Sequence, residues 1–162
     1  MTNVIKVGMA DLNYAIPPDK IRTSGLGSCV GIIIYDDTVK ICGLAHIMLP
    51  DSSQCRSKAV QRSKYADTAI ADLLSYLIKN GAKPSRLKAK IAGGAQMFKF
   101  SSTNEIMRIG PRNVEAVKKF LKENNIKILS EDVGGSSGRT IEFDPLTTIL
   151  NIRTVNKGVK DI

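Results

Sequence analysis

Residues 29–49 read CVGIIIYDDTVKICGLAHIML, and this stretch decides how the chain folds. Residues 29–35 are apolar and rich in β-branched side chains, which is typical of a buried strand. Residues 40–49 are apolar again and predict a return strand, which Pro50 ends. Residues 36–38 (DDT) lie between the two runs and supply turn chemistry. The stretch therefore predicts a buried antiparallel hairpin.

This hairpin brings a thiol and an imidazole together. Counting outward from a tight turn centred near Asp37 and Thr38 places Cys29 directly opposite His46, where Cβ atoms lie about 4.5–5.5 Å apart. A nearby imidazole lowers the pKa of a thiol, and the thiolate is the nucleophile. A slip of one residue would send the two side chains to opposite faces. The pair predicts nucleophilic catalysis; the alternative is a buried cysteine and a hydrogen-bonded histidine in an ordinary hairpin.

The residues that enter the first strand, 25–28 (GLGS), favour an oxyanion site. Glycine lets the backbone adopt positive φ and lets a substrate approach closely. Such an entry aims backbone N–H groups at one point, so Ser28 and Gly27 are the candidate oxyanion residues. The same glycines do not predict a dinucleotide loop, because a strand and not a helix follows them.

The remaining cysteines have no catalytic partner in this arrangement. Cys42 lies four residues from His46 on one strand, about 13 Å away, and is expected to fill the core. Cys55 lies in a polar segment beyond the strand. Zinc held by the three cysteines and His46 lacks a standard ligand spacing, so we expect no metal site. Three cysteines indicate a reducing, cytoplasmic location.

The rest of the chain alternates helical and strand-like periodicity. An amphipathic helix is predicted over 57–80 and a second over 111–124, where Pro111 suits the first turn. The residues of the first helix's apolar stripe are Ala66, Ala69, Ile70, Leu73, Leu74 and Leu77. A half-buried strand is expected over 86–92, with Lys88 and Lys90 on its polar face.

Three further strands are predicted at 126–133, 139–143 and 147–153. Residues 134–138 (GGSSG) are interpreted as a hairpin connection, since they lack the lysine and the following helix of a phosphate loop. Two main helices over a largely antiparallel or mixed sheet predict a layered α/β sandwich. No repeat or linker divides the chain, so we expect a single domain over residues 1–162.

Composition excludes several classes of protein. The 162 residues are 43% hydrophobic and 24% charged, which suits a globular domain, and no apolar run is long enough to enter a membrane as a helix. The net charge of +9 invites a nucleic-acid partner, but aromatic residues make up only 5% and the basic residues are scattered. We expect no nucleic-acid partner; a solvated positive surface and an acidic protein partner stay open.

Several segments together resemble the CheD family of chemoreceptor glutamine deamidases. The two most specific stretches are Gly25–Val30 (GLGSCV) and Gly43–Pro50 (GLAHIMLP). The similarity continues, in order along nearly the whole chain, through Lys64–Asp67, Ala92–Phe98, Ile109–Asn113 and Asp132–Arg139. Cys42 and Cys55 are not part of the pattern.

The resemblance implies a CheD-like α/β sandwich and a catalytic triad. The nucleophile falls on Cys29, the base on His46, and the third member, a threonine six residues before the cysteine, on Thr23. From the residues alone, Thr23 could not be chosen over Ser24, Ser28 or Asp51. The implied reaction converts glutamine side chains of chemotaxis receptors to glutamate with release of ammonia and needs no cofactor.

The resemblance also implies partners and a location. The methyl-accepting chemotaxis receptors are the implied substrate, and the protein would work in the cytoplasm at receptor arrays. The CheC phosphatase is the implied second partner, with Phe98 and Phe100 as candidate binding residues unless they belong to the core. A runner-up hypothesis is a non-catalytic adaptor that binds receptors and CheC.

Overall fold

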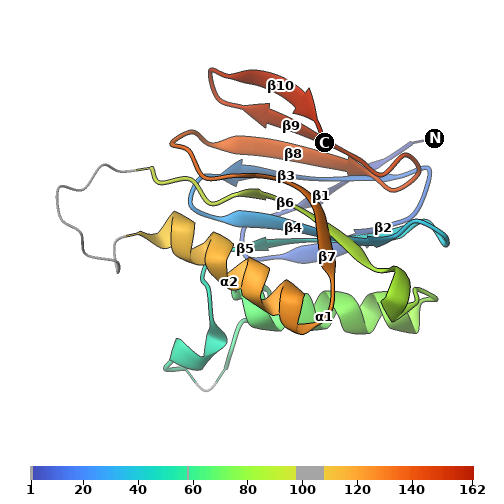
Figure 1. Cartoon of the computed structure of the whole chain (residues 1–162), viewed down its shortest axis with the longest axis horizontal. Coiled ribbons are helices and arrows are strands. Elements are labelled where there is room, and N and C mark those ends of the chain that lie inside the picture. The colour runs from blue at the N-terminus through green and yellow to red at the C-terminus, as the bar shows by residue number, and fades with distance from the viewer. Residues whose placement is uncertain (1, 58, 98–107) are drawn as a thin grey trace.

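The computed structural model describes residues 2–57, 59–97 and 108–162. Within these residues the chain forms three layers: two α-helices, a middle sheet and an outer sheet (Figure 1). The middle sheet has the order β2 (Leu12–Ala15), β5 (Ile41–Ile47), β4 (Val30–Asp36), β6 (Lys88–Gly93) and β7 (Lys127–Val133). The outer sheet has the order β1 (Val4–Val7), β3 (Lys20–Leu26), β8 (Arg139–Asp144), β9 (Ile149–Thr154) and β10 (Gly158–Asp161).

The helices cover one face of the middle sheet, and the outer sheet covers the other. The helices are α1 (Ala66–Lys79) and α2 (Ile109–Glu123), and the short 3₁₀ turns are η1 (Ser52–Gln54), η2 (Arg62–Lys64) and η3 (Pro84–Arg86). In the described residues the ladders are antiparallel except β1 with β3 and β6 with β7. The predicted layered α/β sandwich with two main helices is confirmed, and the second sheet is an addition that the sequence did not indicate.

The predicted hairpin is confirmed as β4 and β5, which are buried along their whole length. Its predicted register is wrong by two residues, because the loop contains four residues and not two. The pairing is Asp36 with Ile41, Gly31 with His46 and Val30 with Ile47. The Asp36 carboxylate accepts the N–H of Thr38 at 2.9 Å and the N–H of Val39 at 3.4 Å. These two bonds stabilise the wider loop. A shift of two keeps every side chain on its predicted face.

The first helix is shorter than predicted. It begins at Ala66 and not at residue 57, although the predicted apolar stripe does face the core. The N–H groups of Met48 and Leu49 donate to Lys64 O, and the N–H of Ala66 donates to Leu49 O. This pairing with the end of β5 holds the backbone extended before Ala66 and prevents an earlier helical start. The second helix, α2, matches its prediction closely.

Two predictions about the later strands are wrong. Residues 134–138 do not close a hairpin, because β7 belongs to the middle sheet and β8 to the outer sheet. Strand β6 is not half-buried, because β4 and β7 flank it and the outer sheet covers its second face. Lys90 therefore lies between the sheets, and its amine donates to Thr148 O at 2.6 Å and to Ile162 O at 2.9 Å.

No helix in the described part of the chain combines the length and the apolar character that crossing a membrane requires.

Candidate active site

Cys29 and His46 lie on the same face of the middle sheet, the face that contacts the outer sheet. Cys29 belongs to the buried cluster between the sheets, together with Ile33 from β4 and Leu44 from β5. His46 lies two residues after Leu44 and therefore shares its face. Cys29 stands diagonally to His46 and not directly opposite, because Gly31 is the residue paired with His46. Diagonal neighbours lie about 7–8 Å apart, so the predicted direct opposition is wrong, although the two side chains do share a face of the sheet.

Gly31 lets the outer sheet approach this point closely. A Cβ atom at Gly31 would lie 2.6 Å from Cδ1 of Ile141 on β8 and 3.2 Å from Cδ1 of Leu26 on β3. These separations leave no space for a side chain. The outer sheet therefore packs directly against the residue that pairs with His46.

Thr23 on β3 reaches across the two sheets to His46. Its Oγ1 lies 2.7 Å from Nδ1 of His46 and donates its proton to Val7 O on β1 at 2.8 Å. A hydroxyl has one proton, so Oγ1 must accept the bond from Nδ1–H. This fixes the tautomer of His46 with Nε2 unprotonated.

Nε2 of His46 is buried and has no hydrogen-bond partner among the described residues. The ring is fully buried, and burial lowers the pKa of His46 to about 4. The imidazole is therefore neutral at pH 7. It carries a free lone pair on the ring nitrogen opposite to Thr23, which is what a general base requires.

The buried imidazole predicts a pH-dependent stability. The unfolded histidine has its pKa near 6.5, so as the pH falls from 6.5 to 4 the unfolded chain binds a proton that the folded chain does not. We expect the free energy of unfolding to fall by about 3 kcal/mol across this range from His46 alone. Urea unfolding of the wild type and of His46→Gln, measured from pH 7 to pH 4, isolates this contribution. Parallel curves for the two proteins would contradict it.

Cys29 lies at the corner where the chain passes from β3 to β4. Cys29 is buried with 7% exposure, whereas His46 is fully buried. Burial raises the pKa of the Cys29 thiol, and its own backbone N–H offsets this only in part. The expectation that the imidazole lowers the thiol pKa is therefore wrong for the resting site. The pair rests as a neutral thiol and a neutral imidazole.

Of the two predicted oxyanion residues, Gly27 has its N–H already engaged. That group donates to Gly25 O at 3.1 Å. The backbone N–H of Cys29 lies close enough to its own sulfur to offset part of the rise in the thiol pKa. The N–H of Ser28 has no described partner. The two N–H groups that could serve an oxyanion in this conformation are thus those of Ser28 and Cys29.

Backbone contacts from the end of β6 hold the Cys29 corner. Gly94 N–H donates to Cys29 O and Ala95 N–H to Gly27 O, both at 2.8 Å. Gly93 has a φ of 114°, and a Cβ atom there would lie 2.3 Å from Cys29 O. A residue other than glycine at this position would displace the backbone at Cys29.

Asn113 on α2 connects the two segments that carry the candidate residues Cys29 and His46, and the sequence did not predict this contact. Its Nδ2 donates to Ser28 O at 2.9 Å and to Met48 O at 3.0 Å. These carbonyls belong to the residue before Cys29 and to the second residue after His46. Asn113 is fully buried, and a buried amide with two such bonds fixes the spacing of the segments. Its position after Gly110 and Pro111 gave no local signal of this contact.

The other candidate residues lie apart from this site or outside the described residues. Cys42 is fully buried, as expected for a core residue. Cys55 is partly exposed beyond β5, and its pKa is lowered first by a hydrogen bond with the Tyr65 side chain. Phe98 and Phe100 lie outside the described residues. Within residues 2–57, 59–97 and 108–162, no three His, Cys, Asp or Glu side chains cluster as a metal site would require.

A buried thiol, a buried imidazole on the same face of the sheet and a hydroxyl that sets the imidazole tautomer form the kind of site that cysteine hydrolases use. Comparison with known proteins makes the class specific. The profile of the family described as "CheD chemotactic sensory transduction" matches residues 48–154. The chain belongs to the CheD family, as the sequence motifs implied.

Relatives align over the whole chain, including the corner and hairpin that carry the candidate site. The chain is 63% identical over 162 residues to the chemoreceptor glutamine deamidase CheD of Halalkalibacterium halodurans, covering all of both chains. It is 57% identical over 159 residues to the protein of the same name from Bacillus subtilis, covering 98% of this chain and 96% of the relative.

Solved structures match less closely. The Neisseria meningitidis protein NMB0706 is 8% identical, with a TM-score of 0.49 over 83% of this chain and 64% of the other.

Proposed function

We propose that this protein is a chemoreceptor glutamine deamidase in which Cys29 is the nucleophile, His46 the general base and acid, and Thr23 the residue that orients His46. The observation that carries the proposal is the bond between Thr23 Oγ1 and His46 Nδ1 at 2.7 Å, which leaves Nε2 free on the face that Cys29 shares. The names of relatives at 57–63% identity supply the reaction and the substrate class.

The reaction begins from a neutral pair. As the substrate amide enters, His46 Nε2 accepts the thiol proton while the sulfur of Cys29 attacks the amide carbon. The carbonyl oxygen becomes an oxyanion, which the N–H groups of Ser28 and Cys29 stabilise. Losing one such donor costs about 3–4 kcal/mol of activation free energy. The uncharged Thr23 stabilises the imidazolium less than a carboxylate would.

The second half of the reaction releases ammonia and then glutamate. The His46 imidazolium protonates the amide nitrogen, the C–N bond breaks, and a thioester to Cys29 remains. Nε2 then takes a proton from water, the resulting hydroxide attacks the thioester carbon, and the proton returns to the sulfur. The net change is glutamine plus water to glutamate plus ammonia. These steps use only groups of the chain and water.

The test is incubation with a glutamine-bearing receptor fragment. We expect the fragment to gain about 1 Da per event, with one ammonia released for each. Cleavage of the fragment would identify a peptidase instead. Binding of the fragment with neither change would favour the runner-up function, an adaptor without catalysis.

The net charge of +9 suits an acidic substrate surface. A basic protein attracts an acidic partner over distance, and this attraction raises the association rate at low salt. We infer that the association rate with the receptor falls as ionic strength rises.

The CheC phosphatase is proposed as a second partner, and receptor arrays are proposed as the place where the protein works. Both rest on family membership, and Phe98 and Phe100 stay candidate residues for binding CheC.

Replacing Thr23 by valine should impair His46 through its tautomer. Without an acceptor at Nδ1, the ring is free to carry its proton on Nε2, where it cannot accept one from the thiol. We expect kcat to fall roughly 10- to 100-fold with little change in KM. The ¹⁵N chemical shifts of the ring nitrogens report the tautomer directly.

Thr23→Ser is the matched control, because it keeps the hydroxyl and should keep most of the activity. If the valine and serine variants lost activity equally, with unchanged ring shifts in both, the proposed role of the hydroxyl would be wrong.

A further inference from the structure

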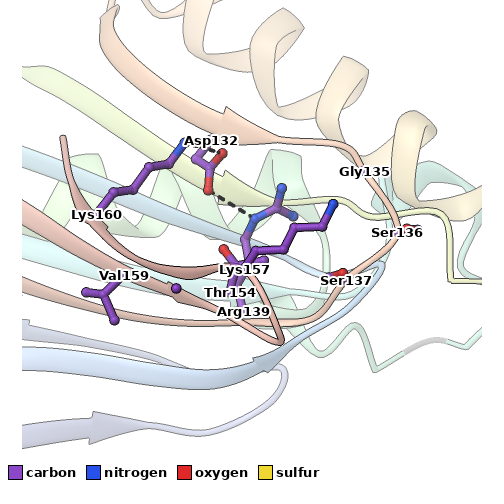
Figure 2. A pocket seen from close by; sticks show the side chains of 10 residues that line it. Asp132, Gly135, Ser136, Ser137, Arg139, Thr154, Lys157, Val159 and Lys160 are labelled. Carbon is purple, nitrogen blue, oxygen red and sulfur yellow. Dashed lines mark hydrogen bonds and ion pairs between the residues drawn. The ribbon is translucent and has the colours of Figure 1, made fainter.

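A pocket lies at the edge of the outer sheet, and Cys29 is not among the residues that line it (Figure 2). Its walls are the 134–138 connection between β7 and β8 and the turn between β9 and β10. Its volume is about 210 Å³, which is enough for the end of a charged side chain and several water molecules. We call it the cationic pocket, because of the charges described next.

The cationic pocket contains three basic side chains and one carboxylate. Asp132 is already occupied: Oδ2 accepts from Nε of Arg139 at 3.2 Å, and Oδ1 pairs with Nζ of Lys160 at 3.0 Å. Lys157 also lines the pocket, and its amine forms no ion pair or hydrogen bond with the described residues. Figure 2 shows Lys157 extending past the Arg139 guanidinium toward the loop at Ser136. The walls therefore carry a net positive charge with one unpaired cation.

The wall formed by the connection adds hydrogen-bond donors. The hydroxyls of Ser136 and Ser137 make no hydrogen bond within the described residues, and both serines line the pocket. Arg139 is 7% exposed and is held by Gly93 O and Gly134 O, so its position is fixed. A fixed guanidinium, a free amine and two free hydroxyls suit an anionic ligand.

The cationic pocket is coupled to the Cys29 corner through shared backbone. Gly93 O accepts both Nη1 of Arg139 and the N–H of Gly134, and Gly93 itself packs against Cys29 O. Arg139 pairs with Leu26, three residues before Cys29. One strand spacing and three residues of chain give a separation of at most about 15 Å between the Cα atoms of Arg139 and Cys29. A substrate seated at the thiol can thus reach the pocket with a neighbouring side chain.

We propose that the cationic pocket binds an acidic side chain of the substrate, a glutamate or aspartate within about 15 Å of the target glutamine in the folded substrate. The proposal rests on the proposed function and deepens it. Lys157 is the residue that determines this preference, since Arg139 and Lys160 are already paired with Asp132. The pocket selects glutamines by their acidic surroundings and takes no part in the bond-breaking steps.

The test compares Lys157→Gln with Lys79→Gln. Lys79 ends α1 in the helical layer, is also exposed and loses the same charge, so it controls for general attraction. Two receptor fragments serve as substrates: one with its acidic residues and one in which the acids near the glutamine are alanine. We expect Lys157→Gln to raise KM roughly five- to tenfold on the acidic fragment only, with kcat unchanged. Lys157→Arg should restore the wild-type KM, and Lys79→Gln should change it less than twofold.

The proposal would be overturned if Lys157→Gln and Lys79→Gln changed KM equally, or if Lys157→Gln raised KM equally on both fragments. Fragment binding to the same variants in a Cys29→Ala background, measured by fluorescence anisotropy, needs no turnover. If the wild type releases no ammonia but binding still depends on Lys157 and on the acids, the deamidase assignment fails and the pocket stands. If binding ignores Lys157, the pocket proposal fails whatever the activity.

Discussion

Cys29→Ser should lower kcat for deamidation by at least about 1000-fold, which corresponds to about 4 kcal/mol of activation free energy. A hydroxyl is a far weaker acid than a thiol. The base that must remove its proton is an imidazole whose pKa burial lowers to about 4. Such a base cannot activate serine. The measurement is ammonia release and mass change with the same receptor fragment.

Cys55→Ser is the matched control, because it makes the same chemical change at a partly exposed cysteine beyond β5. It should leave kcat and the melting temperature unchanged. Deamidation by Cys29→Ser at more than a tenth of the wild-type rate would remove Cys29 from the mechanism.

His46→Gln should produce the second-largest loss, roughly 100- to 1000-fold in kcat at pH 7. Burial raises the pKa of the Cys29 thiol, so almost no thiolate exists at pH 7 without a base. The residual rate should therefore rise with pH through and beyond 9, whereas the wild-type rate stays level across neutral pH. A His46→Gln rate that is independent of pH would contradict this account.

The double variant Thr23→Val with His46→Gln tests whether Thr23 acts only through His46. If Thr23 acts only through the imidazole, valine should have no further effect on kcat once His46 is gone. Additive losses would show that Thr23 has a separate role, such as holding β1 and β3 together through Val7 O.

The hairpin could be predicted from sequence because its information is local. Seven consecutive buried positions in each strand and a polar turn define β4 and β5. The register could not be predicted, because it depends on how the Asp36 carboxylate bonds to the loop and to Arg86, which is 50 residues away. The start of α1 depends likewise on pairing between Leu49 and Tyr65. The sequence of residues 134–138 is typical of a hairpin turn, and only the sheet topology shows that this connection joins two different sheets.

The residues of the candidate site likewise differ in whether local sequence could predict them. Strand alternation alone could predict that Cys29 and His46 share a face, since a shift of two residues keeps each side chain on its face. Thr23 came only from family resemblance, because it approaches His46 from the opposite sheet. Neither the Asn113 contacts nor the cationic pocket could be predicted from the sequence, since each is formed by segments that are distant along the chain. Lys157, for example, joins Arg139 only because β9 pairs with β8.

Acid-quench mass spectrometry of a single turnover tests most directly whether Cys29 attacks the amide carbon. Excess enzyme is mixed with a glutamine-bearing receptor fragment, quenched within milliseconds to seconds, and analysed intact and after digestion. We expect a transient species with the mass of enzyme plus fragment minus about 17 Da, the mass of ammonia, attached at Cys29. Ammonia release with no covalent species at any time, or with attachment at Cys55, would contradict it.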